Sequence, residues 1–298
     1  MKTYLTFGDI HGRSVWKDFV FGSTKKFDEW ALKVYKGEIP EFSSAVVTRF
    51  CNVEKIIFVG DYLDSFTITN VEMKHNLSDL FLFKRTYEDR VIMLWGNHDV
   101  SYWLKKQMCE GFRPEMYNDF HELIRDNRRH MQFSFQVGNM IWTHAGLTKN
   151  FFEEIVSDMD AWFTVKYHNV DGASLNNESM LSEFMNDMWE AYNWKPLLSK
   201  GRARGGINTP GPLWADRKEL VVDLLPGFRQ FVGHTPIKEI ATYGSGDTTA
   251  CFVDCLEFGE YRAAAPVEVD EMNQYAGYAR KMLGSDNAKV SFDFKNKK

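Results

Sequence analysis

The feature that most restricts this chain is a short apolar run that leads directly into a turn carrying metal-capable side chains. Residues 4–7 have the length and composition of a buried strand, and Gly8-Asp9-Ile10-His11-Gly12 follows them. Ligands of open α/β sheets bind at the carboxyl ends of the strands, so this layout predicts that Asp9 and His11 lie at a binding edge. The two glycines let the backbone turn sharply there.

The same layout recurs four more times along the chain. The later runs span residues 56–59, 91–95, 140–142 and 231–232, and they precede Asp61, then Asn97 with His98, then His144, then His234. Five repetitions are hard to explain as polar groups that merely end strands, so they predict one shared metal centre. Carboxylate oxygens mixed with imidazole nitrogens suit a borderline divalent ion such as Mn, Fe or Zn.

The ordered set resembles the motifs of the calcineurin-like metallophosphoesterases and, within them, the bacterial and phage branch of the phosphoprotein phosphatases. The resemblance covers positions 8 to about 260. It implies an α/β fold, a four-layer β-sandwich flanked by helices, and a centre of two divalent transition-metal ions. Manganese is the expected ion, with Fe or Zn as alternatives. The implied metal ligands are Asp9 and His11 for the first ion, Asp61 as the bridge, and Asn97, His144 and His234 for the second ion.

The resemblance also implies a mechanism, in which a metal-bridging hydroxide attacks phosphorus in line. His98 corresponds to the general acid that protonates the leaving group, and Asp64 corresponds to the carboxylate that orients its imidazole. The simpler alternatives are that His98 only donates a hydrogen bond beside the metals and that Asp64 only ends a loop. The block context favours the catalytic interpretation for both residues.

Some positions depart from the family pattern. Ser65 and Phe66 stand where the phosphoprotein phosphatases have Arg-Gly, so one phosphate-binding arginine is missing, and Asp99 replaces a usual Glu. Arg217, which follows a Trp-containing segment at residues 213–216, is the predicted remaining phosphate-binding residue. Arg204 and Arg202, in a glycine-rich loop, are the alternatives.

The blocks extend from Asp9 to His234, so they must converge in one fold, and we expect residues 1–298 to form a single domain. The stretch at about 150–212 is the predicted insertion. Within it, residues 181–194 form a predicted helix whose Met and aromatic stripe we expect in the core, although it could also cover the site. Residues 250–254 and a turn at Gly259-Glu260 predict a closing antiparallel hairpin.

Composition limits the partners and the location. The formal net charge is −5, which argues against a nucleic-acid-wrapping face. The four cysteines show neither zinc-site spacing nor a disulfide framework. No apolar run reaches transmembrane length and residue 4 already enters the first strand, so we expect a soluble, cytoplasmic protein without a signal peptide.

The leading functional hypothesis is a metal-dependent phosphomonoesterase, of the serine/threonine protein phosphatase type, that acts on a phosphorylated protein or a small phosphoester. The alternative is a nucleotide-directed hydrolase, similar to diadenosine tetraphosphatases or cyclic-nucleotide phosphodiesterases. A non-catalytic binding module is a third hypothesis, which the complete ligand set and His98 argue against.

Overall fold

Four parallel strands from the first half of the chain form one sheet. In the computed structural model, which describes residues 3–46, 53–167 and 180–255, these strands are β1 (Thr3–Phe7), β2 (Val53–Phe58), β3 (Val91–Leu94) and β4 (Met131–Gln132). They lie in the order β1-β2-β3-β4, so all their carboxyl ends point to the same edge.

The second sheet is mixed and has the order β5-β6-β7-β9-β8. Its strands are β5 (Phe135–Val137), β6 (Met140–Trp142), β7 (Arg229–Val232), β8 (Ala241–Ser245) and β9 (Thr248–Phe252). The chain passes from the first sheet to the second at Phe133 and Ser134. The pairing of Val137 with Met140 confirms the turn at Gly138-Asn139.

The two sheets pack face to face because alternate residues of their strands are apolar. Thr6, on the same side of β1 as Tyr4, accepts a hydrogen bond from Trp142 Nε1 across the interface, at 2.9 Å. The side chains buried between the sheets are Tyr4, Ile57, Val59, Ile92 and Leu94 from the first, and Met140, Trp142, Phe231 and Val253 from the second. The intervening residues of β1 and β2, such as Phe7 and Phe58, pack with the helices instead.

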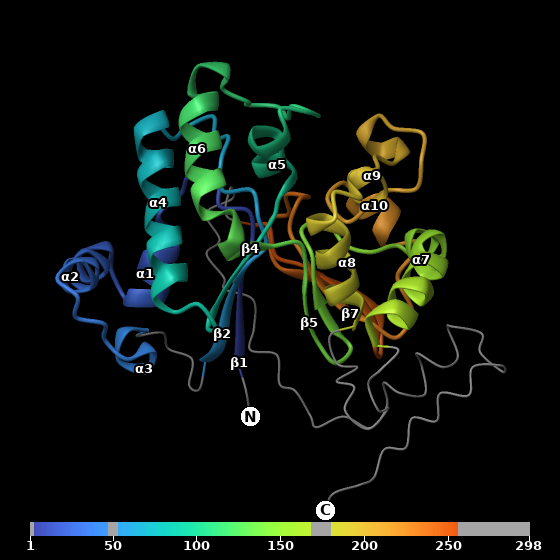
Figure 1. The fold of residues 1–298 in the computed structure, drawn as a ribbon, viewed down its shortest axis with the longest axis horizontal. Coiled ribbons are helices and arrows are strands. Elements are labelled where there is room, and N and C mark those ends of the chain that lie inside the picture. Colours follow the sequence, from blue (N-terminus) through green and yellow to red (C-terminus); the bar gives the residue numbers. More distant parts are fainter. Residues whose placement is uncertain (1–2, 47–52, 168–179, 256–298) are drawn as a thin grey trace, which may run out of the picture.

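Helices cover the outer faces of both sheets, which confirms the predicted four-layer arrangement (Figure 1). On the side of the first sheet lie α1 (Val15–Phe21), α2 (Thr24–Tyr35), α3 (Phe42–Ala45), α4 (Asn70–Thr86) and α6 (Tyr117–Asn127). On the other side lie α7 (Lys149–Tyr167), α8 (Met180–Glu190), α9 (Trp194–Leu197) and α10 (Arg217–Leu220). Helix α5 (Asn97–Leu104) starts just beyond the carboxyl end of β3. No helix within the described ranges is long and apolar enough to cross a membrane.

Helix α8 confirms that the predicted aromatic stripe belongs to the core. Phe184, Met188 and Trp189 are all buried, and the Trp189 ring lies 5.2 Å from that of Trp95. Tyr192, beyond the end of the helix, is exposed instead. The stripe therefore packs α8 onto the sandwich.

The hairpin predicted for residues 250–254 was assigned the wrong partner strand. Strand β9 pairs antiparallel with β8, which precedes it, and parallel with β7 on its other edge. Both edges of β9 are therefore occupied, one by β8 and the other by β7. The turn that closes the hairpin lies at Gly246-Asp247, whereas Gly259-Glu260 fall outside the described residues.

Candidate active site

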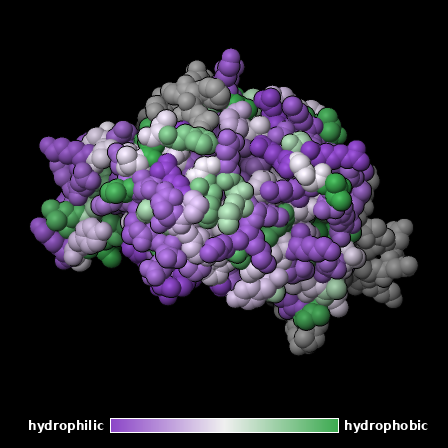
Figure 2. Space-filling model, turned by 90° about the horizontal axis from the view of Figure 1, so that it is seen from above, coloured by the Kyte–Doolittle hydropathy of each residue, from purple (hydrophilic) through white to green (hydrophobic). Residues whose placement is uncertain are grey.

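The predicted metal-binding residues meet at the carboxyl edge of the strands. Asp9 follows β1, Asp61 follows β2, Asn97 opens α5 after β3, His144 follows β6 and His234 follows β7. Figure 2 shows the molecule from above, where this edge faces the viewer, and the surface there is mostly hydrophilic with scattered apolar side chains. The topology thus explains why residues from distant parts of the sequence share one site.

Three of the predicted ligands converge on one point. His144 Nε2 lies 2.7 Å from Asn97 Oδ1 and 3.2 Å from His234 Nδ1, and the last two atoms lie 2.9 Å apart. Asp61 Oδ2 lies 3.3 Å from the same His144 nitrogen. Adjacent ligands of an ion with bonds of about 2.1 Å at right angles would lie roughly 3 Å apart, so these separations fit a coordination sphere.

The protonation pattern of these groups also fits a cation. His144 Nδ1 lies 2.9 Å from the carbonyl oxygen of Val59, so the ring proton belongs on Nδ1 and Nε2 carries a free lone pair. That lone pair faces two acceptor oxygens, from Asn97 and Asp61. Lone pairs that face one another in a buried site repel unless a cation lies between them. Metal-bound histidines usually donate their other N–H to a carbonyl, as His144 does here.

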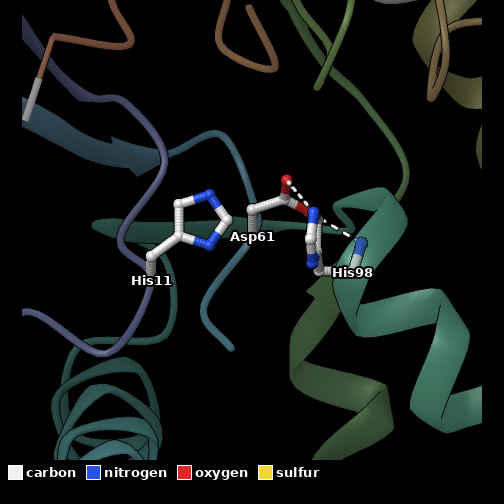
Figure 3. Close-up of side chains that lie close together, drawn as sticks. All are labelled: His11, Asp61 and His98. Atoms are coloured by element: carbon white, nitrogen blue, oxygen red, sulfur yellow. Dashed lines mark hydrogen bonds and ion pairs between the residues drawn. The ribbon is translucent and has the colours of Figure 1, made fainter. Parts of the chain in front are cut away.

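His11 and His98 lie on opposite sides of Asp61 (Figure 3). His11 Nδ1 lies 2.7 Å from the carbonyl oxygen of Leu63, which again leaves Nε2 free as a ligand. The His11, Asp61 and His98 side chains form a second group that could hold a metal. His98 differs from His11 and His144 because the partner of its Nδ1 is a carboxylate, that of Asp64 at 2.9 Å, and not a backbone carbonyl oxygen.

The charges of the site favour a bound cation. Burial and the charges of Asp254 and Asp61 raise the pKa of Asp9 well above its usual range. Burial also lowers the pKa values of His11 and His234, so both rings are neutral at neutral pH, as metal ligands must be. A divalent ion would relieve the repulsion between the carboxylates of Asp9 and Asp61.

Two glycines of the motifs are needed because ligand carboxylates approach the backbone. A Cβ atom on Gly96 would lie 2.2 Å from Asp61 Oδ1, and one on Gly233 would lie 2.0 Å from Asp9 Oδ1. Each carboxylate also accepts backbone N–H bonds from another block: Asp61 from His98 and Asp9 from His234. The glycines therefore bring neighbouring blocks into contact.

Asp99 organises the loop that carries Asp61. Its carboxylate accepts hydrogen bonds from the backbone N–H groups of Asp61, Tyr62 and Gly96, at 2.9 to 3.0 Å. The side chain is completely buried. Asp99 thus ties the end of β2 to the end of β3.

Several site residues have left-handed backbones, a conformation that costs on the order of 1–3 kcal/mol away from glycine. His11, Asp61, Asp64 and His234 have φ values of 44°, 52°, 63° and 66°. Such strain persists only where surrounding contacts enforce it, and it is typical of functional sites.

His98 and Asp64, the predicted acid pair, are in contact. Burial lowers the pKa of His98, but the carboxylates of Asp61 and Asp64 outweigh this and raise it to about 9. The imidazole therefore carries a proton at neutral pH and can donate it. His98 Nε2, the nitrogen turned away from Asp64, lies 3.8 Å from Asp61 Oδ2.

The candidate phosphate-binding arginines lie near His234 but differ in their contacts. Arg204 Nη2 donates to the carbonyl oxygen of His234 at 3.4 Å and to Thr235 Oγ1 at 3.3 Å. Arg217 reaches the same hydroxyl through its backbone N–H, at 3.2 Å. Arg202 is exposed. The guanidinium with side-chain contacts at the metal ligands is therefore that of Arg204.

Sequence reasoning missed three residues at the site. Asp254 follows β9 and repeats the layout of an apolar run before an acid, a signal that could have been recognised. Lys200 Nζ lies 3.5 Å from the centre of the Trp214 ring, and that ring meets His234 edge-on at 5.9 Å. Tyr102 donates to Asp64 at 2.5 Å. No motif marks Lys200 or Tyr102.

Comparison with known proteins identifies the family of this chain. The family model described as calcineurin-like phosphoesterase matches residues 2–238. No curated protein matches significantly. Among solved structures, one described as a cold-active protein tyrosine phosphatase is 14% identical, with a TM-score of 0.45, and the match covers 86% of this chain and 70% of that one. From the family match, the chain belongs to the calcineurin-like phosphoesterases, hydrolases that cleave phosphate esters with the help of divalent metal ions.

Proposed function

We propose that this enzyme is a phosphomonoesterase of the serine/threonine protein phosphatase type. The observation that carries the proposal is the convergence of Asn97, His144 and His234 beside Asp61, with the protonated His98 next to the same carboxylate. The site thus offers both ligands for a cation and a proton donor. Hydrolysis of an alkyl phosphate needs both.

The proposed ligands are Asp9 and His11 for a first ion, Asp61 for both ions, and Asn97, His144 and His234 for a second. Manganese suits this mixed oxygen and imidazole set. Such ions neutralise charge on phosphoryl oxygens and lower the pKa of a coordinated water.

The protein's own contribution is centred on His98 and Asp64. Asp64 accepts from His98 Nδ1, which fixes the ring and leaves Nε2 to protonate the leaving oxygen. Asp61 Oδ1 accepts from the backbone N–H of His98 at 2.9 Å, so the carboxylate that serves the ions also fixes the position of the acid. The proton donor and the metal ligands are therefore held in one rigid unit.

We assign the phosphate contact to Arg204 in preference to Arg217. An ion pair with Asp216, 3.1 Å from Arg204 Nε, holds the guanidinium beside His234. Lys200 lies on the neighbouring Trp214 ring and adds positive charge on this side of the site. Ser65 stands where the phosphoprotein phosphatases have an arginine, so position 65 supplies no second guanidinium for phosphate.

A nucleotide-directed activity is the second candidate, because Phe66 supports it. This side chain stands two residues after Asp64 and is 71% exposed, so its ring is free to stack on a base. Turnover of phosphoserine peptides, phosphothreonine peptides, dinucleoside polyphosphates and cyclic nucleotides by the Mn-loaded enzyme separates the candidates. Highest kcat/KM on the peptides supports the proposal, and highest kcat/KM on either nucleotide class rejects it.

A further inference from the structure

Asp64 receives a second buried hydrogen bond besides the one from His98. The Tyr102 hydroxyl donates to Asp64 Oδ1 at 2.5 Å, while Oδ2 accepts from His98 Nδ1 at 2.9 Å. Tyr102 is fully buried and Asp64 is 3% exposed. The carboxylate is therefore held by one donor on each oxygen, which fixes the plane in which it meets the imidazole.

The Tyr102 hydroxyl is itself fixed. The backbone N–H of Arg113 donates to its oxygen at 2.8 Å, so that oxygen has its acceptor role filled and its proton is directed at Asp64. The ring stacks on Phe112 with centroids 4.6 Å apart, and Phe120 meets it edge-on at 5.1 Å. Neither the ring nor the hydroxyl can turn without breaking these contacts.

Arg113 holds the same turn from the outside. Its guanidinium donates to the carbonyl oxygens of Ser65 and Ile68, the latter at 3.1 Å. These bonds pin the backbone just after Asp64, whose φ of 63° is a strained conformation that needs such support. The arginine missing at position 65 is thus matched by one that stabilises the loop instead of binding substrate.

We propose that Tyr102, supported by Arg113, is a positioning residue that keeps Asp64 aligned with His98. The inference rests on the proposed function, since it concerns the proton that His98 gives to the leaving group. Without the hydroxyl, Asp64 Oδ1 would lose a buried donor, and the carboxylate could rotate away from the imidazole. Such a loss affects substrates that need the proton, whereas a packing defect affects all substrates alike.

The kinetic test compares Tyr102→Phe with wild type on a phosphoserine peptide and on p-nitrophenyl phosphate, both with Mn-loaded protein. We expect kcat for the peptide to fall about tenfold, part of the 10²–10⁴-fold effect of a general acid. KM, bound metal and kcat for p-nitrophenyl phosphate should barely change, because p-nitrophenolate leaves without a proton. Equal losses on both substrates would overturn the proposal.

Tyr87→Phe is a matched control. Tyr87 is also buried and its hydroxyl donates to the carbonyl oxygen of Pro40 at 2.7 Å, but it lies at the opposite end of α4 from the site. Its ratio of peptide to p-nitrophenyl phosphate turnover should match wild type. Adding Tyr102→Phe to Asp64→Asn should cost nothing further if Tyr102 acts through Asp64. A full additional loss in that background would contradict the role.

A spectroscopic measurement decides the contact without activity. In protein loaded with diamagnetic Zn²⁺, the proton between His98 and Asp64 should give a downfield imidazole N–H signal that His98→Asn removes. Tyr102→Phe should shift or broaden this signal, and an unchanged signal would refute the positioning role. If wild type hydrolyses neither substrate, the proposed function fails, while this signal still tests whether Tyr102 holds the pair.

Discussion

His144 Nε2 and His234 Nδ1 lie 3.2 Å apart in a buried part of the molecule. Burial and the charge of His144 lower the pKa of His234 well below its usual value. The His234 ring is therefore available as a neutral ligand. The parallel pairing of β6 and β7 places the two histidines side by side, at a separation that suits ligands of one metal ion.

Asp61→Asn should be the most damaging change to a single ligand, because this carboxylate is proposed to serve both ions. We expect metal content to drop and turnover to fall on the order of a hundredfold or more, beyond the 10–100-fold typical of residues that only support ligands. Elemental analysis and kcat on one preparation measure this. Asp119→Asn, a surface carboxylate paired with Lys74, is the control and should match wild type. Retention of both ions by Asp61→Asn would contradict the bridging role.

His98→Asn should separate a proton donor from a structural residue. Turnover of a phosphoserine peptide should fall roughly 10²–10⁴-fold, because an alkoxide leaves poorly without a proton. Turnover of p-nitrophenyl phosphate should fall much less, and metal content should be unchanged. Asp64→Asn should show the same pattern more weakly. A loss of metal that parallels the loss of rate would instead make His98 a ligand, as its proximity to Asp61 allows.

Arg204→Ala should lower kcat/KM roughly 10- to 150-fold, equivalent to the 1.5–3 kcal/mol of a charge-assisted phosphate contact. Arg217→Ala should have a smaller effect, because the contact of Arg217 with Thr235 is made by its backbone. Arg202→Ala, in the same loop but exposed, is the matched control. Steady-state kinetics of the three variants rank them. A larger loss in Arg217→Ala would return the role to the residue predicted from the sequence.

The buried Lys84 should make the folded protein more stable as the pH rises. Burial lowers its pKa from 10.5 to about 8, although Glu88 and Asp89 partly offset the shift. Between these pH values the unfolded chain binds the proton more tightly than the folded chain, so stability rises with pH. The full difference between the two pKa values changes the free energy of unfolding by up to about 3 kcal/mol.

Lys84→Met lacks this titration. Urea unfolding measures the free energy of unfolding of Lys84→Met and of wild type. The difference in favour of Lys84→Met should be largest near pH 7 and should shrink as the pH is raised toward 10. The Lys84 side chain is 6% exposed and donates to the carbonyl oxygen of Glu88 at 2.7 Å, a bond that the Met variant loses at every pH. A difference that does not vary with pH would show that Lys84 keeps its ordinary pKa in the folded protein.

The convergence of the predicted ligand residues could be expected from the sequence because each motif lies directly after a local apolar run. Parallel pairing then brings the ends of β1, β2 and β3 together whatever the loops do. Tyr102 had no such signal. It reaches Asp64 only because the loop between α5 and α6 folds back so that Arg113 can hold its hydroxyl. Contacts of this kind depend on the tertiary path of a loop and carry no periodicity.

The pairing of β9 and the position of Arg204 also depend on how loops fold. The pairing of β9 was misjudged because Gly246-Asp247 was not recognised as the turn, and the predicted partner lay on the wrong side in sequence. The preference for Arg217 came from its position after the Trp-containing segment, whereas the contacts of Arg204 depend on how residues 201–206 fold against Glu219 and Asp216. Backbone turns and contacts between loops determine both the pairing of β9 and the placement of Arg204, whereas its role in binding phosphate stays a proposal.

The most direct test of the account is a metal titration of chelator-stripped protein. Mn²⁺ is added stepwise, counted as ions per chain. Bound metal and the hydrolysis of a phosphoserine peptide are measured together at each step. We expect no activity in the stripped protein, a rise in activity that reaches its plateau at two bound ions per chain, and no rise in Asp61→Asn. Full activity without metal, or two bound ions without hydrolysis of any phosphomonoester, would contradict it.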